Sequence, residues 1–71
     1  MRIMRIKIPM KDSDKIIKAL IEAGWVKVHT RGDHQKWKSP DGRTTIVTHP
    51  VKDIPVGTRK AIERQTGLKI F

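Results

Sequence analysis

Cysteine is absent from this sequence of 71 residues. Its absence excludes a disulfide framework and any metal site built on thiolates, and it fits a reducing compartment. Uncharged runs are short, and none approaches the roughly 18 residues that a membrane span requires. The first nine residues place Arg2, Arg5 and Lys7 among their apolar side chains, so they lack the continuous apolar stretch of a signal peptide. We therefore expect a soluble, cytoplasmic protein with no membrane association.

Acidic residues are also scarce. Seven Asp and Glu accompany 16 Lys and Arg, which leaves a formal net charge of +9. Such a charge attracts polyanions, of which nucleic acid is the commonest. Binding to a membrane surface is the rival interpretation, but it needs an amphipathic helix whose apolar face is free. The two helices predicted below need their apolar faces for a core, so nucleic acid is favoured.

The chain is long enough for one small domain only, which excludes a large enzyme with its own nucleotide-binding domain. Hydrophobic residues make up 37% of it, enough for a modest core and too many for a disordered tail. We divide the chain into an N-terminal extension, residues 1–9, and a single domain, residues 10–71. Within the extension, Arg5-Ile6-Lys7-Ile8 alternates polar and apolar, which predicts a possible extra strand.

Two helices are predicted from apolar spacing and end signals. The first follows N-cap chemistry at Asp12-Ser13-Asp14 and ends at Gly24. The second covers 58–66, and Gly67 ends it. Their inward residues are expected to be Ile16, Ile17, Leu20 and Ile21 on the first helix and Ala61, Ile62 and Gln65 on the second. Leu68, Ile70 and Phe71 are expected to pack against the core.

Between the helices the sequence alternates with a period of two, which predicts strands at 25–30, 34–39 and 43–48. Short connections that contain Gly32 and Gly42 predict tight turns. The fold class is therefore α+β in the order α-β-β-β-α, with two helices on one face of a three-stranded antiparallel sheet. Double-stranded-RNA-binding modules use this order, so we expect a dsRBD-like fold.

Strand alternation predicts which side chains lie on the sheet face without helices. If Val26 and Val28 point to the helices, then Trp25, Lys27 and His29 point away from them. If Trp37 also points inward, then the outward residues of the second strand are His34, Lys36 and Lys38. The parity of the third strand stays open.

This predicted outer face is basic and has no carboxylate. One interpretation is a solvated polar surface without function. The other, which we favour, is a platform on which lysines bind RNA phosphates. Trp25 and Trp37 could stack on bases, but two tryptophans in so small a domain are better explained as core residues.

His34 is the main candidate for chemistry. It begins a strand directly after a glycine turn, and a neutral imidazole can accept a proton from a ribose 2′-OH while lysines stabilise charge on phosphorus. Only RNA carries that hydroxyl. His29 and His49 are weaker candidates for assistance. A metal centre made of His29, His34, His49 and Asp33 would lack the usual short ligand spacings, so no metal or other cofactor is expected.

Residues 11–68 resemble the HicA family, the small toxins of HicAB toxin–antitoxin pairs. No single motif is specific, but together they keep the family's order and spacing. The matching pieces are Glu22-Ala23-Gly24-Trp25, Gly32-Asp33-His34, Trp37, Ser39-Pro40-Asp41-Gly42, Thr48-His49-Pro50, Gly57-Thr58, Ile62, Arg64-Gln65 and Gly67-Leu68.

The resemblance implies a metal-independent ribonuclease that cleaves messenger RNA and a HicB-type antitoxin as partner. It places the family's catalytic histidine at His34, with Asp33 in place of the family's common serine. Backbone binding is expected from Lys27, Arg31, Lys36 and Lys38. The alternative is a non-catalytic RNA-binding module that uses the same basic face.

Overall fold

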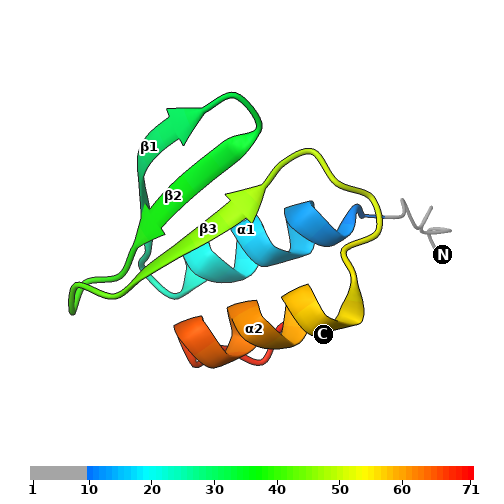
Figure 1. Ribbon diagram of the computed structural model, residues 1–71. Helices are drawn as coiled ribbons and strands as arrows, with labels where there is room; N and C mark the ends of the chain where they lie inside the picture. Colours follow the sequence, from blue (N-terminus) through cyan, green and yellow to red (C-terminus); the bar gives the residue numbers. More distant parts are fainter. Residues whose placement is uncertain (1–9) are drawn as a thin grey trace, which may run out of the picture.

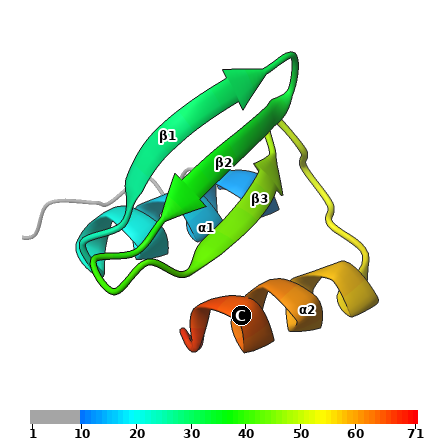
Figure 2. The ribbon, with the colours of Figure 1, turned by 60° about the vertical axis from the view of Figure 1, so that its left-hand side comes forward.

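The computed structural model describes residues 10–71, so the predicted extra strand at 5–8 lies outside the described part. The elements are α1 (Asp12–Glu22), β1 (Val26–Arg31), β2 (His34–Lys38), β3 (Thr44–Thr48) and α2 (Val56–Thr66). The strands form one antiparallel sheet in the order β1-β2-β3. Both helices lie on the same side of this sheet (Figure 1 and Figure 2). The predicted α+β fold and its element order are confirmed.

The core fills the space between the sheet and the helices. Each of its larger side chains contributes about 2 kcal/mol through burial. Both tryptophans belong to it, and the indole Nε1 of Trp37 donates a hydrogen bond to Oε1 of Gln35 at 3.1 Å. They are therefore packing residues, as favoured from the sequence. The buried apolar side chains are Ile16, Leu20, Trp25, Trp37, Val47, Ile54 and Ile62.

Helix α1 begins without the predicted side-chain cap. Lys11 is the N-cap residue and makes no side-chain capping bond. Instead, the free N–H groups of Asp12 and Ser13 donate to the carbonyl oxygens of Lys52 and Val51 at 3.0 and 3.2 Å. The loop before α2 thus supplies the acceptors that a helix start needs.

The helix ends and the remaining inward residues follow the prediction in part. Gly24 and Gly67 have φ values of +86° and +71° and end the two helices as expected. Ile21, expected inside, is 59% exposed, because the apolar stripe of α1 is narrower than predicted. Helix α2 starts at Val56, before the expected residue, and it buries Thr66, which was not predicted.

Before the register shift in β1, the side-chain directions are the reverse of the prediction. Trp25 is buried, whereas Val26 and Val28 are 57% and 49% exposed. A register shift between Lys27 and His29 gives β1 one extra residue, and such a shift breaks strict alternation. The assumption that both valines point to the helices was therefore wrong.

The same shift decides where the cations of β1 lie. Lys27 is opposite Trp37, and His29 is opposite Lys36. Directly opposed residues of an antiparallel pair share a face of the sheet. Lys27 is thus on the helix side at the sheet edge, contrary to the prediction, and His29 is on the other side, as predicted.

Candidate nucleic-acid interface

The side of the sheet away from the helices consists of three cross-strand rows, and we call it the open face. Strand β2 defines it: Trp37 is buried on the helix side, so alternation turns His34, Lys36 and Lys38 to the opposite side. Their partners on β1 and β3 share that side. The rows are Arg31–His34–Thr48, His29–Lys36–Ile46 and Val26–Lys38–Thr44.

His34 is the first residue of β2, and its position is set by the turn before it. Gly32 has a φ of +58° and Asp33 has a negative φ, which fits the type II′ turn of a two-residue hairpin. The carbonyl oxygen of Asp33 accepts a hydrogen bond from the N–H of His49 at 2.8 Å. The turn is thereby tied to the end of β3, and His34 stands exposed between Arg31 and Thr48. Sequence reasoning did not identify Thr48, because the parity of its strand was undecided.

The open face is positively charged without compensation from within the sheet. The three strands contain no Asp or Glu at all. Among residues 10–71, no ion pair joins Arg31, Lys36 or Lys38 to a carboxylate. Asp41, in the turn after β2, is bound by the hydroxyl of Ser39 and by Arg43, which together hold its pKa below the usual value. Its charge is therefore already paired with groups in its own turn.

The sheet places the three histidines on two different sides. His29 and His34 are both exposed on the open face, in neighbouring rows. His49 follows Thr48 and turns to the helix side, where its Nδ1 lies 2.9 Å from the hydroxyl of Ser13 and 3.6 Å from Oδ1 of Asp14. The structure thus brings His34 together with His29 and does not bring it together with His49.

Ser13 is a structural residue that the sequence did not reveal. It is fully buried, and its hydroxyl also accepts a hydrogen bond from the N–H of Val51 at 2.9 Å. The sequence pattern around it resembled a helix cap, and nothing in the sequence linked it to His49, 36 positions later.

In the part of the chain that the structure describes, no three His, Cys, Asp or Glu side chains gather as metal ligands would. Neither of the two helices described is long and apolar enough to cross a membrane.

The family model described as the HicA toxin of bacterial toxin–antitoxin matches residues 13–68, which is most of the chain. The chain belongs to the HicA toxin family. Membership in the HicA family supports a role as the toxin of a toxin–antitoxin pair. No curated protein sequence matches the chain significantly. The matched HicA region includes α1 apart from its first residue, all of α2, all three strands and the whole open face.

Proposed function

We propose that this protein is a ribonuclease toxin that cleaves messenger RNA on its open face, with His34 as general base. One observation carries the proposal: an exposed histidine stands in the row Arg31–His34–Thr48, on a sheet face without carboxylates, in a HicA-family chain. The family supplies the toxin role, and the row supplies residues suited to RNA chemistry.

The proposed reaction uses the ribose 2′-OH as nucleophile. A neutral imidazole of His34 removes the proton from that hydroxyl, whose oxygen then attacks the adjacent phosphorus. A new P–O2′ bond forms and the P–O5′ bond breaks, which leaves a 2′,3′-cyclic phosphate and a 5′-OH end after the leaving oxygen takes up a proton. His29, in the neighbouring row, is the candidate donor of that proton. These steps require no metal ion.

Three cations on the open face are suited to bind the RNA backbone. Arg31 is directly opposite His34, and Lys36 and Lys38 follow it on the same side of β2. Residues two apart on a strand are about 6.7 Å apart, so the cations form a ladder along β2 that begins beside His34. A guanidinium at Arg31 is placed to stabilise charge that develops on the phosphate during attack. Lys27, on the helix side of the sheet, is not part of this proposed surface.

As the toxin of a pair, the protein is proposed to act in the cytoplasm and to be held inactive by a HicB-type antitoxin. The competing function is RNA binding without cleavage on the same face. Its supporting observation is that His49, the other candidate for assistance, is engaged with Ser13 on the helix side, so a second catalytic group depends on His29 alone.

The decisive experiment is cleavage of a defined messenger RNA in excess EDTA by the parent protein and His34→Ala. Loss of general base catalysis is expected to slow cleavage by roughly 10²–10⁴-fold while RNA affinity stays within a few fold. The RNA ends are then identified, and a 2′,3′-cyclic phosphate is expected.

His29→Ala is the matched histidine control, because it removes an imidazole from the neighbouring row of the same face. It is expected to slow cleavage less than His34→Ala does. Equal cleavage by the parent and His34→Ala would refute the catalytic assignment. Tight, salt-sensitive binding without any cleavage by the parent would favour the binding module.

A further inference from the structure

Within residues 10–71, strand β3 is an edge strand without the usual protection against pairing. Its sequence, Thr44-Thr45-Ile46-Val47-Thr48, is entirely β-branched and uncharged. Natural edge strands are usually protected by charges, proline or a bulge. The opposite edge strand, β1, has such protection, because it carries Lys27, Arg31 and the register shift.

The backbone groups on the outer side of β3 have no partner among residues 10–71. Hydrogen bonds from His49 N–H to the Asp33 carbonyl and from Ser39 N–H to the Arg43 carbonyl bracket the β2–β3 ladder. Because bonded pairs alternate in an antiparallel ladder, Thr45 and Val47 bond to β2 and Ile46 directs its N–H and C=O outward, as do Thr44 and Thr48. None of the hydrogen bonds found among residues 10–71 uses these outward groups of Ile46.

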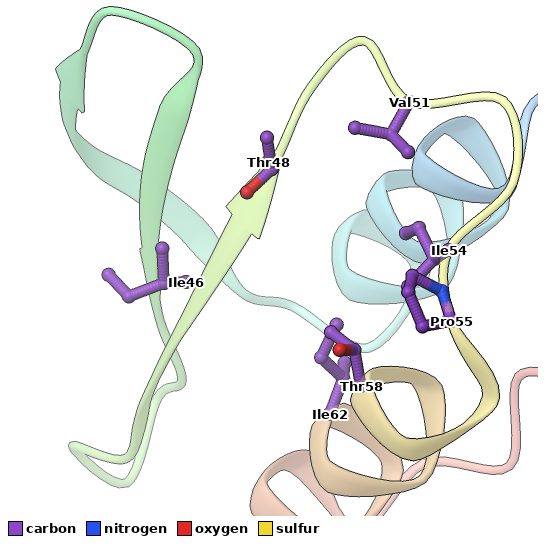
Figure 3. A pocket seen from close by; sticks show the side chains of 7 residues that line it. All are labelled: Ile46, Thr48, Val51, Ile54, Pro55, Thr58 and Ile62. Carbon is purple, nitrogen blue, oxygen red and sulfur yellow. The ribbon is translucent and has the colours of Figure 1, made fainter.

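An apolar groove runs beside this edge, and we call it the β3 groove. It has a volume of ≈ 260 Å³ and lies between β3, the loop before α2 and the first turns of α2 (Figure 3). A cavity of roughly 150 Å³ is enough to hold benzene, so the β3 groove can accept a large apolar side chain. Its lining residues are Ile46, Thr48, Val51, Ile54, Pro55, Thr58 and Ile62.

We propose that the β3 groove is the docking site of the antitoxin, which adds an extended segment of alternating apolar and acidic residues to the edge of β3. In such strand addition, main-chain bonds supply affinity and alternate side chains supply specificity. Side chains on the helix side would enter the groove above Ile54 and Ile62. Those on the open side would lie beyond Ile46 and Thr44, within reach of Lys36 and Lys38 in the same rows.

Charge selects this occupant over two others. A second copy of the chain would bring another net charge of +9 against the first. The chain's own residues 1–9 carry Arg2, Arg5 and Lys7 and no acid, so they too lack the complementary charge. An acidic segment gains attraction where both of these meet repulsion.

Docking in the β3 groove also explains how the partner would inhibit the toxin. Neighbouring strands are about 4.8 Å apart, so an added strand lies about 10 Å from β2. It would extend the row Arg31–His34–Thr48 by one position and obstruct the approach of RNA to His34. This inference rests on the proposed toxin role.

The test measures binding of the purified HicB-type antitoxin of the same toxin–antitoxin pair to the full toxin and to Thr58→Glu. Thr58 lines the β3 groove on α2 (Figure 3), and none of the cations proposed to bind RNA lines that groove. A carboxylate there would have to be buried against the apolar side chains that enter the groove, and affinity is expected to fall roughly tenfold or more. An acid in the first turn of a helix is favourable, so the variant should fold.

Val56→Glu is the matched control, because Val56 is in the same first turn, is 53% exposed and does not line the groove. It should bind the antitoxin as the parent does. Residue-resolved amide exchange supplies the second measurement: the Ile46 N–H should exchange rapidly in the free toxin and slowly in the complex. Equal affinities for both glutamate variants would overturn the proposal, and so would slow exchange at Ile46 in the free monomer.

Self-association is the remaining outcome to separate. A parent protein that is dimeric in solution and becomes monomeric as Thr58→Glu would mark the groove as a contact between toxin copies, and this would also overturn the proposal. RNA cleavage is assayed in parallel for Thr58→Glu and His34→Ala. If His34→Ala cleaves RNA as the parent does, the catalytic assignment is refuted and the docking site is not. If Thr58→Glu binds the antitoxin as the parent does, the docking site is refuted and the catalytic assignment is not.

Discussion

His34 and His49 show how two histidines at one end of the sheet can differ in environment. The backbone bond from His49 to Asp33 joins the end of β3 to the turn that precedes His34. The imidazole of His49, on the helix side, is in turn held by the buried hydroxyl of Ser13. His34 therefore stands in solvent on a backbone that is fixed from the opposite side of the sheet.

Removing the Ser13 hydroxyl should destabilise the whole domain. In Ser13→Ala the Val51 N–H loses its acceptor and the His49 ring loses its 2.9 Å partner. Leaving such groups unsatisfied costs about 1–3 kcal/mol, measured as the free energy of unfolding in urea. For a domain of this size, each 1 kcal/mol corresponds to a fall in Tm of about 4–8 °C.

Asp14→Asn is the control at the same histidine. Asp14 is 40% exposed and lies 3.6 Å from Nδ1 of His49, so losing its charge should cost less than about 1 kcal/mol. Equal losses in the two variants would contradict this, because they would mean that the ring's contact with the acid contributes as much as the buried hydroxyl.

At the scale of elements, the sequence predicted the strands and helices well, but it could not predict how β1 registers against β2. Alternation assigns sides only while every residue has one partner, and the shift between Lys27 and His29 removes that condition. Strand β2 has no such shift, so the sides of His34, Lys36 and Lys38 follow from one buried tryptophan. The contact between Ser13 and His49 joins segments far apart in sequence, and no local pattern encodes it.

The C-terminal tail is held to α2 by one carboxylate. Oε2 of Glu63 accepts hydrogen bonds from the N–H groups of Phe71 and Ile70 at 3.0 and 2.7 Å, and these bonds hold the pKa of Glu63 below its usual value. A carboxyl whose pKa is lowered on folding stabilises the protein above its usual pKa, near 4.5, and loses that contribution as the pH falls through the lowered value. The Tm of the parent should therefore fall on acidification, and the Tm of Glu63→Gln should fall less over the same pH range.

Glu22→Gln serves as the comparison for this acid effect. Glu22 is exposed at the end of α1, and none of the hydrogen bonds found among residues 10–71 involves its side chain. Its substitution should leave the slope of Tm against pH as in the parent. The contrary result is that Glu22→Gln flattens the slope of Tm against pH as much as Glu63→Gln does. General charge repulsion, and not the hydrogen bonds to the tail, would then explain the loss of stability in acid.

At the scale of the whole molecule, the helices occupy one side of the sheet, and no other element of residues 10–71 covers the opposite side (Figure 2). Under the proposed function, the net charge of +9 would attract RNA at a distance, and the cations on the open face would contact the bound strand. The salt dependence of binding separates these two contributions, because its slope counts the phosphates that are neutralised.

Arg31, Lys36 and Lys38 should give a slope of log affinity against log salt of about −2, since each phosphate contact with a single strand contributes about −0.7. Fluorescence anisotropy with a single-stranded RNA measures it. Lys36→Ala should make the slope less steep by about 0.7. Lys27→Ala removes the same charge from the helix side of the sheet and should leave the slope nearly unchanged. Equal changes in both variants would mean that RNA does not select the open face.

The alternation along β2 has a consequence for how this protein can evolve. Gln35 and Trp37 point to the helices and are bound to each other, whereas His34, Lys36 and Lys38 point to solvent. Neighbouring residues of β2 are thus under different constraints. Folding constrains the inner residues, and under the proposed function the bound ligand constrains the outer ones. Substitutions at the outer positions can accumulate without repacking the core, so if this face binds RNA as proposed, new RNA preferences can arise in this strand one residue at a time.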